Sequence, residues 1–459
     1  ELKAKLKEIA KHYNITLDSD LPEPSMLRDL ITALSEKTGK KTVILIDEYD
    51  NFANTILSTS GSNAYQKLTH GEGFFRHFFS ILKAGTTDIN SGLDRMFITG
   101  VSPITLDDVT SGFNIGNNIS LLEEFNEMLG FTEEEVKVML EYYKTAGALK
   151  TDTKKCFEIM QKWYDGYTFA KYGEKTLFNT DMVLYFISNA ARRIPDKLID
   201  QNIKIDYGKL RHLIVISRQL NGNFSALKEV IEKEKTATEI EESFPLEKLS
   251  SPENFISLLY YFGLLTFRGI SLGQSTLGIP NLAIKNLMYG YIREAYYDVN
   301  IFRINMQKLD TYIRYMGWNG TWKDFFSFLS EEVKEQTSVR DYIEGEKVIQ
   351  GFLLAYLSIA DIFIPHTEYE ANKGFSDFYL EPFVAKYPDM KYGFIIELKY
   401  IKRKDKVEDL EKIAEKANAQ IAQYAEDKKI LNSLKGRADL KKLLLVYHGW
   451  ELVHIKEII

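Results

Sequence analysis

The chain of 459 residues is predicted to fold as a multidomain α/β protein. Its length exceeds the roughly 100 to 200 residues of an ordinary domain, so more than one hydrophobic core is expected. Hydrophobic residues make up 45% and charged residues 27% of the chain, which is the composition of a globular protein without long disorder. Apolar runs rich in β-branched residues also alternate with helical patterns, as in α/β folds.

The charge and the cysteine content limit the classes of function. A formal net charge of -7 gives no overall attraction to nucleic acid, so any nucleic-acid binding must come from a local basic patch. The single cysteine, Cys156, excludes an intrachain disulfide and a cysteine-rich zinc site, and it indicates a reducing compartment. We therefore expect a cytoplasmic protein.

No membrane span is predicted. The two longest apolar segments, residues 255–267 and 351–364, fall short of the roughly 18 to 20 residues that a bilayer requires, and the second contains Asp361. The first residues, ELKAKLKEIAKHY, start in mid-helix at Glu1 without a signal-peptide pattern. The chain is therefore expected to begin inside a longer parent protein.

Residues 25–105 are predicted to form part of a doubly wound domain. Ser25 is expected to cap a helix that ends at Gly39. The continuous apolar runs 42–46 and 96–101 are predicted to be strands. Such runs are typical of parallel strands that are covered on both faces.

Two acidic residues, Asp47 and Glu48, follow the first of these strands in the stretch VILIDEYD. This pattern is typical of a Walker B element, in which the aspartate holds Mg²⁺ through water and the glutamate polarises the hydrolytic water. The alternative is a strand that ends in an acidic turn. No glycine-rich G-x-x-x-x-G-K-[ST] loop is present, and TGKKT at 38–42 precedes a strand, so the chain is not a complete P-loop ATPase.

Residues 116–334 are predicted to be mostly helical. Thr132 and Glu135 form a capping-box pattern for a helix that runs to Gly147. Residues 254–281 and the segment after them indicate a helix, a hairpin and a second helix, which is compatible with a small winged-helix-like unit.

The pattern changes again near residue 335. A helix is predicted at 345–357, followed by strands at 376–384 and from 392, a charged helix at 405–428 and a last strand at 442–448. This order is αββαβ.

Candidate site residues lie at the ends of these strands. Glu397 and Lys399 are two residues apart and therefore on one side of their strand. In an antiparallel hairpin, Asp377 comes beside Glu397, and Glu370 lies seven residues before Asp377. Clustered carboxylates repel one another unless a cation neutralises them, and such oxygen ligands suit Mg²⁺ or Mn²⁺. Lys399 beside them would hold or deprotonate an attacking water and offset charge on a phosphate.

The set Glu370, Asp377, Glu397 and Lys399 resembles the PD-(D/E)XK nuclease superfamily, although Ser376 replaces the family proline. The resemblance implies an αβββαβ core that cuts nucleic acid with Mg²⁺, metal ligation by Asp377 and Glu397, and a catalytic role for Lys399. Gln420 and Tyr424 resemble the Q-x-x-x-Y element of many such nucleases, which would orient the water or a phosphate oxygen. Glu346 occupies the place of a further acidic residue in some members.

A basic patch follows Lys399. Its members Lys402, Arg403, Lys404 and Lys406 are suited to contacts with phosphates, which position nucleic acid without reading its sequence. DNA is favoured over RNA as the partner. Taken singly, the E-x-K pair is also compatible with a solvated salt bridge at a strand end, and the basic run with a solvated face.

The remaining segments resemble a bacterial AAA-ATPase-like family that carries such a nuclease domain at its C-terminus. FITGVSPI (97–104) resembles the sensor strand, and NNISLLEEFNEMLGFTEEEV, WYDGY and LFNTDMVLYF resemble the helical lid. In that family the Walker A loop lies upstream, so ATP binding is expected only in a longer parent chain. The domains are then 1–115 (partial AAA-like ATPase domain), 116–334 (helical lid and winged-helix-like region) and 335–459 (nuclease-like domain).

The sequence thus predicts Mg²⁺-dependent phosphodiester hydrolysis of nucleic acid, coupled to ATP binding or hydrolysis in the parent protein. The alternative is a non-catalytic regulatory NTPase or nucleic-acid-binding module with a vestigial nuclease site. An oligomer is compatible with either.

Overall fold

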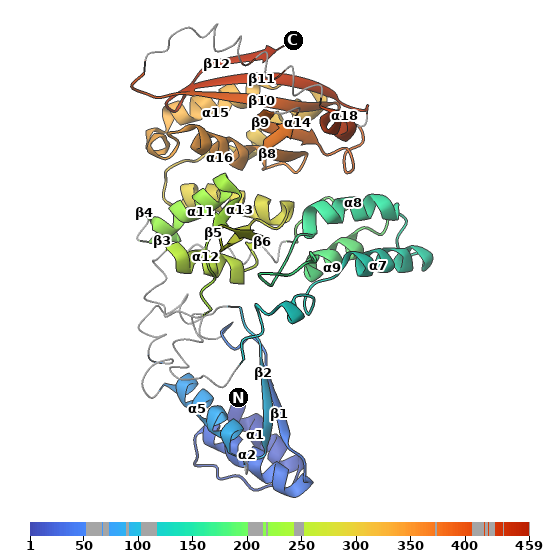
Figure 1. Ribbon diagram of the computed structural model, residues 1–459, viewed down its shortest axis with the longest axis vertical. Helices are drawn as coiled ribbons and strands as arrows, with labels where there is room; N and C mark the ends of the chain where they lie inside the picture. Colours follow the sequence, from blue (N-terminus) through green and yellow to red (C-terminus); the bar gives the residue numbers. More distant parts are fainter. Residues whose placement is uncertain are drawn as a thin grey trace. The chain divides into compact units, whose positions relative to one another are not determined.

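The computed structural model describes residues 1–51, 67, 73–88, 91–101, 117–200, 214–216, 219–242, 252–371, 374–405, 417, 421, 427–434 and 436–458 (Figure 1). The chain divides into two compact units. The first comprises Glu1–Phe125, Ala237–Leu265 and Ser271–Ser275, and the second comprises Asn126–Thr236, Thr266–Ile270 and Thr276–Ile459. Among the helices described, none combines the length and the apolar content that a membrane span requires.

The N-terminal part of the first unit is a small α/β arrangement. Its elements are α1 (Leu2–His12), α2 (Glu23–Thr38), β1 (Thr42–Ile46), α5 (Phe74–Thr87) and β2 (Leu93–Ile98). Strands β1 and β2 pair in parallel, as the continuous apolar runs predict. Gly39 ends α2 in the left-handed region at φ 68°, also as predicted. The predicted cap at Ser25 is wrong, because α2 begins at Glu23 after Pro22, with Pro24 in its first turn.

Only one face of this two-stranded sheet is covered among the residues described. Phe79 and Leu82 of α5 are buried against the face that carries Ile44 and Met96, together with residues of α2. On the opposite face, Leu45 is 75% exposed. The expectation that helices cover both faces is therefore met on one face alone, since α2 and α5 lie on the same side.

The middle of the chain is largely helical, as predicted. Its elements are η1 (Glu123–Phe125), α7 (Glu133–Thr145), α8 (Thr153–Tyr164), α9 (Thr180–Asn189), β3 (Val215–Ile216), β4 (Gln219–Leu220), α11 (Gly222–Lys233), β5 (Lys235–Ala237), α12 (Pro252–Tyr261), β6 (Thr266–Ser271), β7 (Gln274–Gly278), α13 (Leu282–Asp298), α14 (Met306–Asn319), α15 (Lys323–Glu335) and η4 (Thr337–Tyr342). The capping box of Thr132 and Glu135 is present in full. The order α12, β6, β7, α13 is the predicted helix, hairpin and helix. A winged-helix unit stays a prediction.

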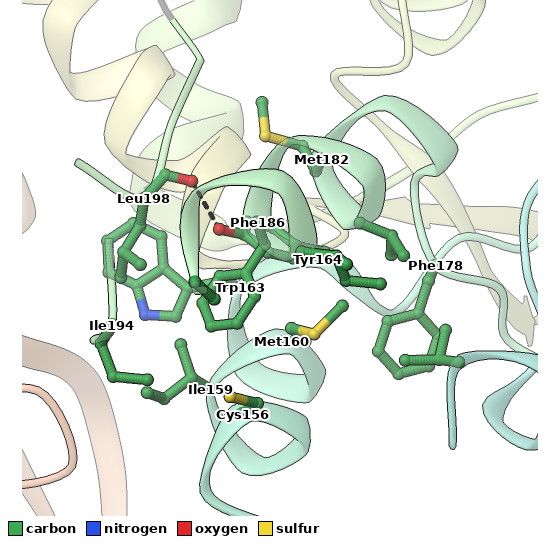
Figure 2. Packing of buried hydrophobic residues seen from close by; sticks show 14 of the residues in the cluster. Cys156, Ile159, Met160, Trp163, Tyr164, Phe178, Met182, Phe186, Ile194 and Leu198 are labelled. Atoms are coloured by element: carbon green, nitrogen blue, oxygen red, sulfur yellow. Dashed lines mark hydrogen bonds between the residues drawn. The ribbon is translucent and has the colours of Figure 1, made fainter. Parts of the chain in front are cut away.

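A hydrophobic core joins α7, α8 and α9 to the C-terminal sheet. Figure 2 shows part of this core, around residues of α8 and α9. Cys156, Met160 and Phe186 are buried in it. The hydroxyl of Tyr164 donates a hydrogen bond of 2.7 Å to the carbonyl oxygen of Leu198, which pairs a polar group that burial would otherwise leave unsatisfied. Ile364 and Phe383 of the C-terminal region belong to the same core, so the helices and the sheet share buried contacts within the second unit.

The C-terminal region is a five-stranded sheet in the order β12-β11-β10-β9-β8. Its elements are α16 (Glu346–Leu357), β8 (Phe363–Ala371), β9 (Gly374–Pro382), β10 (Tyr392–Ile401), α18 (Lys428–Leu434), β11 (Asp439–His448) and β12 (Glu451–Ile458). Strands β10 and β11 are parallel, and the other neighbours are antiparallel.

The order αββαβ, predicted from the sequence pattern, omits β8 and β12, and this is a correction. The αβββαβ order that the resemblance implies includes three strands before the helix, as observed, and lacks only β12. Both β8 and β12 are edge strands of the sheet. Each mixes charged and apolar residues, because one side of an edge strand meets solvent, and β8 contains Pro365. Neither therefore shows the continuous apolar run that marks a buried strand.

One face of this sheet is covered by helical residues that follow β10. Tyr379, Ile395 and Leu444 pack there against Ala417, Ile421 and Ile430. Residues 417 and 421 are helical, in agreement with the predicted helix at 405–428, most of which lies outside the described residues. A separate helix, α18, begins at Lys428, where the predicted helix ends.

Candidate functional site

The antiparallel register of β9 and β10 sets the position of Asp377. Ile396 pairs with Phe378, so the next step along both strands brings Asp377 to Glu397. The Oδ2 atom of Asp377 accepts a hydrogen bond of 2.7 Å from the main-chain N–H of Leu398. Two carboxylates that are distant in the sequence are thus adjacent on neighbouring strands.

Glu397 and Lys399 form an ion pair within β10. The Nζ atom of Lys399 lies 2.7 Å from Oε1 of Glu397, as expected for side chains two residues apart on one side of a strand. Glu397 is only 3% exposed, whereas the Lys399 side chain is 33% exposed. The other carboxylate oxygen of Glu397, Oε2, is buried and has no hydrogen-bond partner among the described residues. A buried oxygen of this kind is costly unless another group binds it.

Helix α16 brings two further side chains to the pair of acids. Glu346, its first residue, raises the pKa values of Asp377 and Glu397 by charge repulsion, which places it in the same electrostatic environment. Gln350, one turn later, donates a hydrogen bond of 3.0 Å from Nε2 to the main-chain oxygen of Asp377. Gln350 was missed in the sequence, although its spacing of four residues from Glu346 is the signal for a shared helix face.

Burial and charge repulsion change the protonation of the two acids. Burial, followed by the charge of Glu397, raises the pKa of Asp377 to about 7, and the Leu398 N–H and Lys399 only partly oppose this. Burial likewise raises the pKa of Glu397, against the opposing hydrogen bond and charge of Lys399.

The pKa of the Lys399 amine is also raised, but by its acidic neighbours rather than by burial. Burial acts to lower the pKa of Lys399, but the hydrogen bond and charge of Glu397, with the charge of Asp377, outweigh burial and raise it. Lys399 is therefore a positively charged ammonium at neutral pH, which favours an electrostatic role over that of a general base.

The carboxylates of Asp377 and Glu397 are suited to bind a hard divalent cation. Asp377 and Glu397 share the single ammonium of Lys399, and the unpaired Oε2 of Glu397 is an available oxygen ligand. Within the described ranges, no group of three or more His, Cys, Asp or Glu side chains lies close enough together to hold a metal ion. A cation there would take the one or two carboxylates that Mg²⁺ usually accepts, with waters or phosphate oxygens completing its shell.

A second acidic site lies at the end of β1. Asp47 accepts a hydrogen bond from the hydroxyl of Thr99, which follows β2. Glu48 has a left-handed backbone at φ 50° and accepts a hydrogen bond of 2.8 Å from Asn51 Nδ2. A third acid, Asp50, is buried at 2% exposure and accepts a 3.1 Å hydrogen bond from the N–H of Val101. The sequence interpretation missed Asp50, since its burial depends on the segment after β2.

Comparisons with known proteins agree with this geometry. Residues 344–457 match the family described as the PD-(D/E)XK nuclease superfamily. The C-terminal region is a PD-(D/E)XK nuclease superfamily domain. Residues 1–110 match a family of predicted AAA-ATPases, described as AAA-ATPase-like. Neither the search of curated proteins nor the search of solved structures found a match to this chain.

The PD-(D/E)XK match indicates a general class of function. A domain of this superfamily indicates a nuclease-type hydrolase whose substrate is nucleic acid, and such nucleases generally use divalent metal ions. Asp377, Glu397 and Lys399 all lie within the matched residues, as do Glu346 and Gln350.

Several predicted site residues of the PD-(D/E)XK domain are not described. Gln420, Tyr424 and Lys406 lie outside the described residues. Glu370 lies in β8, where its backbone pairs with Phe375, but its side chain is outside the described set.

The rest of the basic patch lies at the end of β10. Lys402, Arg403 and Lys404 follow β10 directly and are exposed. The N–H of Gly449 donates to the carbonyl oxygen of Ile401, which holds this end of β10 against the turn between β11 and β12. The patch is therefore close in sequence to Lys399 and open to solvent.

Proposed function

We propose that the PD-(D/E)XK domain hydrolyses phosphodiester bonds of nucleic acid with Mg²⁺ or Mn²⁺ held by Asp377 and Glu397. The observation that carries the proposal is the pairing of these two acids across β9 and β10, with one buried oxygen of Glu397 left without a partner. Glu370 is proposed as a further ligand.

The residues around the pair are proposed to act on the substrate. When bound, a divalent cation supplies positive charge that offsets the phosphate and favours ionisation of an attacking water. The Lys399 ammonium would stabilise negative charge that develops on the phosphate oxygens. Gln420 and Tyr424 are proposed to orient the water or a phosphate oxygen.

The exposed cations after β10 would bind the nucleic-acid backbone. Lys402, Arg403, Lys404 and Lys406 are proposed to contact phosphates, because these contacts position a strand without reading its sequence. We propose DNA rather than RNA as the preferred substrate.

The N-terminal region is proposed to link this activity to nucleotide in a longer parent protein. The match to AAA-ATPase-like proteins and the acids at the end of β1 support this role. Asp47 would hold Mg²⁺ through water and Glu48 would polarise the hydrolytic water.

One observation favours a second candidate, a nucleic-acid-binding or regulatory module with a vestigial nuclease site. In the part of the chain that the structure describes, three metal-ligating side chains do not come together. This second candidate requires that Asp377 and Glu397 bind a divalent cation too weakly for catalysis.

A cleavage assay separates the two candidates. Single-stranded DNA, duplex DNA and RNA are incubated with the protein and Mg²⁺ or Mn²⁺. Asp377→Asn and Lys399→Met should each reduce cleavage by about 100-fold or more, because each removes a charge that acts in the transition state. Circular dichroism and the melting temperature establish that the variants remain folded.

Lys441→Met is the matched control. Lys441 also pairs with a glutamate on the sheet, at 2.6 Å from Glu457, but between β11 and β12. Its removal should leave cleavage unchanged. Metal-dependent cleavage that survives in Asp377→Asn would overturn the proposed metal site. No cleavage by the unaltered protein on any substrate would overturn the proposed activity and favour the vestigial site.

A further inference from the structure

The buried amide of Gln350 holds Asp377 from the side of helix α16. Gln350 is 4% exposed, and its Nε2 donates to the main-chain oxygen of Asp377 at 3.0 Å. The carboxylate of the same aspartate is held separately by the N–H of Leu398 at 2.7 Å. The main chain and the side chain of Asp377 are thus held by two different elements.

Helix α16 carries this amide and an acid on one face. Glu346 and Gln350 are four residues apart, so both side chains lie on the same side of the helix. The hydrogen bond from Gln350 to Asp377 turns this helix face toward β9, and the charge of Glu346 also acts on the acids of β9 and β10. A shift of α16 would therefore move both Glu346 and the support of Asp377.

Cations of the helical region hold the C-terminal end of α16 and the end of η4, the short helix that precedes α16. Arg293 of α13 donates to the main-chain oxygen of Ala355 and, at 3.0 Å, to the hydroxyl of Ser358 at the C-terminal end. Lys228 of α11 donates at 2.6 Å to the main-chain oxygen of Tyr342, just before the helix begins. A cation at a helix C-terminus is also favoured by the helix dipole. Helix α16 is therefore anchored at its C-terminal end, and its Gln350 can position a residue of β9 through one hydrogen bond.

We propose that Gln350 is a positioning residue of the nuclease site, which fixes the main chain of Asp377 so that its carboxylate presents a preformed oxygen ligand. This inference rests on the proposed function. Residues that hold a metal ligand in place without touching the metal typically reduce metal affinity or activity by about 10- to 100-fold when they are removed. A Gln350 that only stabilised the fold would change the melting temperature and leave metal affinity unaltered.

The first test compares Gln350→Met with Gln336→Met. Methionine keeps the length of the side chain and removes the amide donor. Gln336, at the C-terminal end of α15, also donates from Nε2 to a main-chain oxygen, that of Arg303 at 2.6 Å. Binding of Mn²⁺ is measured by calorimetry without nucleic acid. Gln350→Met should raise the Kd about 10-fold, and Gln336→Met should leave it within about twofold of the unaltered protein.

The second test is independent of metal and of activity. Amide hydrogen exchange is followed at Leu398, whose N–H is donated to the Asp377 carboxylate. Loss of the Gln350 support should release this carboxylate, so Gln350→Met should exchange faster at Leu398 while Gln336→Met should not. If Gln350→Met fails to fold, Gln350→Asn provides the same test, because its shorter amide does not reach Asp377.

The outcomes separate the two proposals. Unchanged exchange at Leu398, or equal losses of Mn²⁺ affinity in the Gln350 and Gln336 variants, would overturn the positioning role. An unaltered protein that binds no Mn²⁺ and cuts no substrate would refute the proposed function. Faster exchange in Gln350→Met alone would still show that Gln350 holds Asp377 in place.

Discussion

Lys399 donates to Glu397 at 2.7 Å, so the acid and the amine of the E-x-K pattern already bind each other on strand β10. Only one oxygen of Glu397 is satisfied by this ion pair, and the second oxygen stays buried without a partner among the described residues. Asp377 lies on the adjacent strand, so one ammonium faces more than one carboxylate.

The metal-free protein should lose stability as the pH rises from 5 to 8. The pKa of Asp377 is raised from 3.8 to about 7 in the folded state, chiefly by burial, so the folded state holds a proton that the unfolded state releases. The stabilising contribution of this proton is fully present below the unfolded pKa and is lost as the pH rises through about 7. The loss should be on the order of 2 kcal/mol relative to Asp377→Asn, which does not titrate.

Urea unfolding with a chelator at pH 5, 6, 7 and 8 measures this difference. The free energy of unfolding of the unaltered protein should fall more steeply with pH than that of Asp377→Asn. Parallel pH profiles for the two proteins would show that Asp377 ionises normally in the folded state.

Replacing Glu397 by glutamine should stabilise the metal-free protein and weaken metal binding. Glutamine keeps an oxygen that can accept from Lys399 but removes a buried charge that repels Asp377. We expect a gain of about 1 kcal/mol in the free energy of unfolding with a chelator present. Thermal unfolding with and without Mn²⁺ tests this, because Mn²⁺ should raise the melting temperature of the unaltered protein but not of Glu397→Gln. A variant less stable than the unaltered protein without metal would contradict it.

Removing Lys402, Arg403 and Lys404 of the basic patch should weaken the binding of nucleic acid and should also make that binding less dependent on salt. Each phosphate contact contributes about 0.9 to the slope of log K against log[salt] for duplex DNA. Changing Lys402, Arg403 and Lys404 together to alanine should therefore make this slope shallower, by about two to three in magnitude. Fluorescence anisotropy at several salt concentrations, with a chelator to prevent cleavage, measures the slope. An unaltered slope would mean that this patch is only a solvated face.

Cys156 should be inert in the folded protein. Burial, followed by the charge of Asp152, raises the pKa of its thiol to about 11, and the residue has no exposed surface. Reactive cysteines are exposed and ionised, so alkylation at pH 8 should be slow in the native state and fast in denaturant. Mass spectrometry after timed addition of iodoacetamide follows the reaction. Complete labelling within minutes under native conditions would contradict the burial of this core.

Local sequence patterns were sufficient to predict those elements whose determining residues lie within a few positions of one another. The run 42–46 predicted β1, the pair Thr132 and Glu135 predicted a cap, and Gly39 predicted a helix end. The alternation of side chains in a strand also placed Glu397 and Lys399 on one side of β10. In each case the determining interaction is between near neighbours in the chain.

Features that depend on distant contacts required the tertiary structure. The edge strands β8 and β12 are set by pairing with β9 and β11, which offsets their weak apolar pattern. The burial of Asp50 and the reach of Gln350 to Asp377 depend on segments that the chain brings together only on folding. The sequence alone determined which residues are chemically suited to the site, because residue type and short spacing are local properties. The fold decided which of them meet, how deeply they are buried and therefore how they ionise, because these depend on strand register and helix packing.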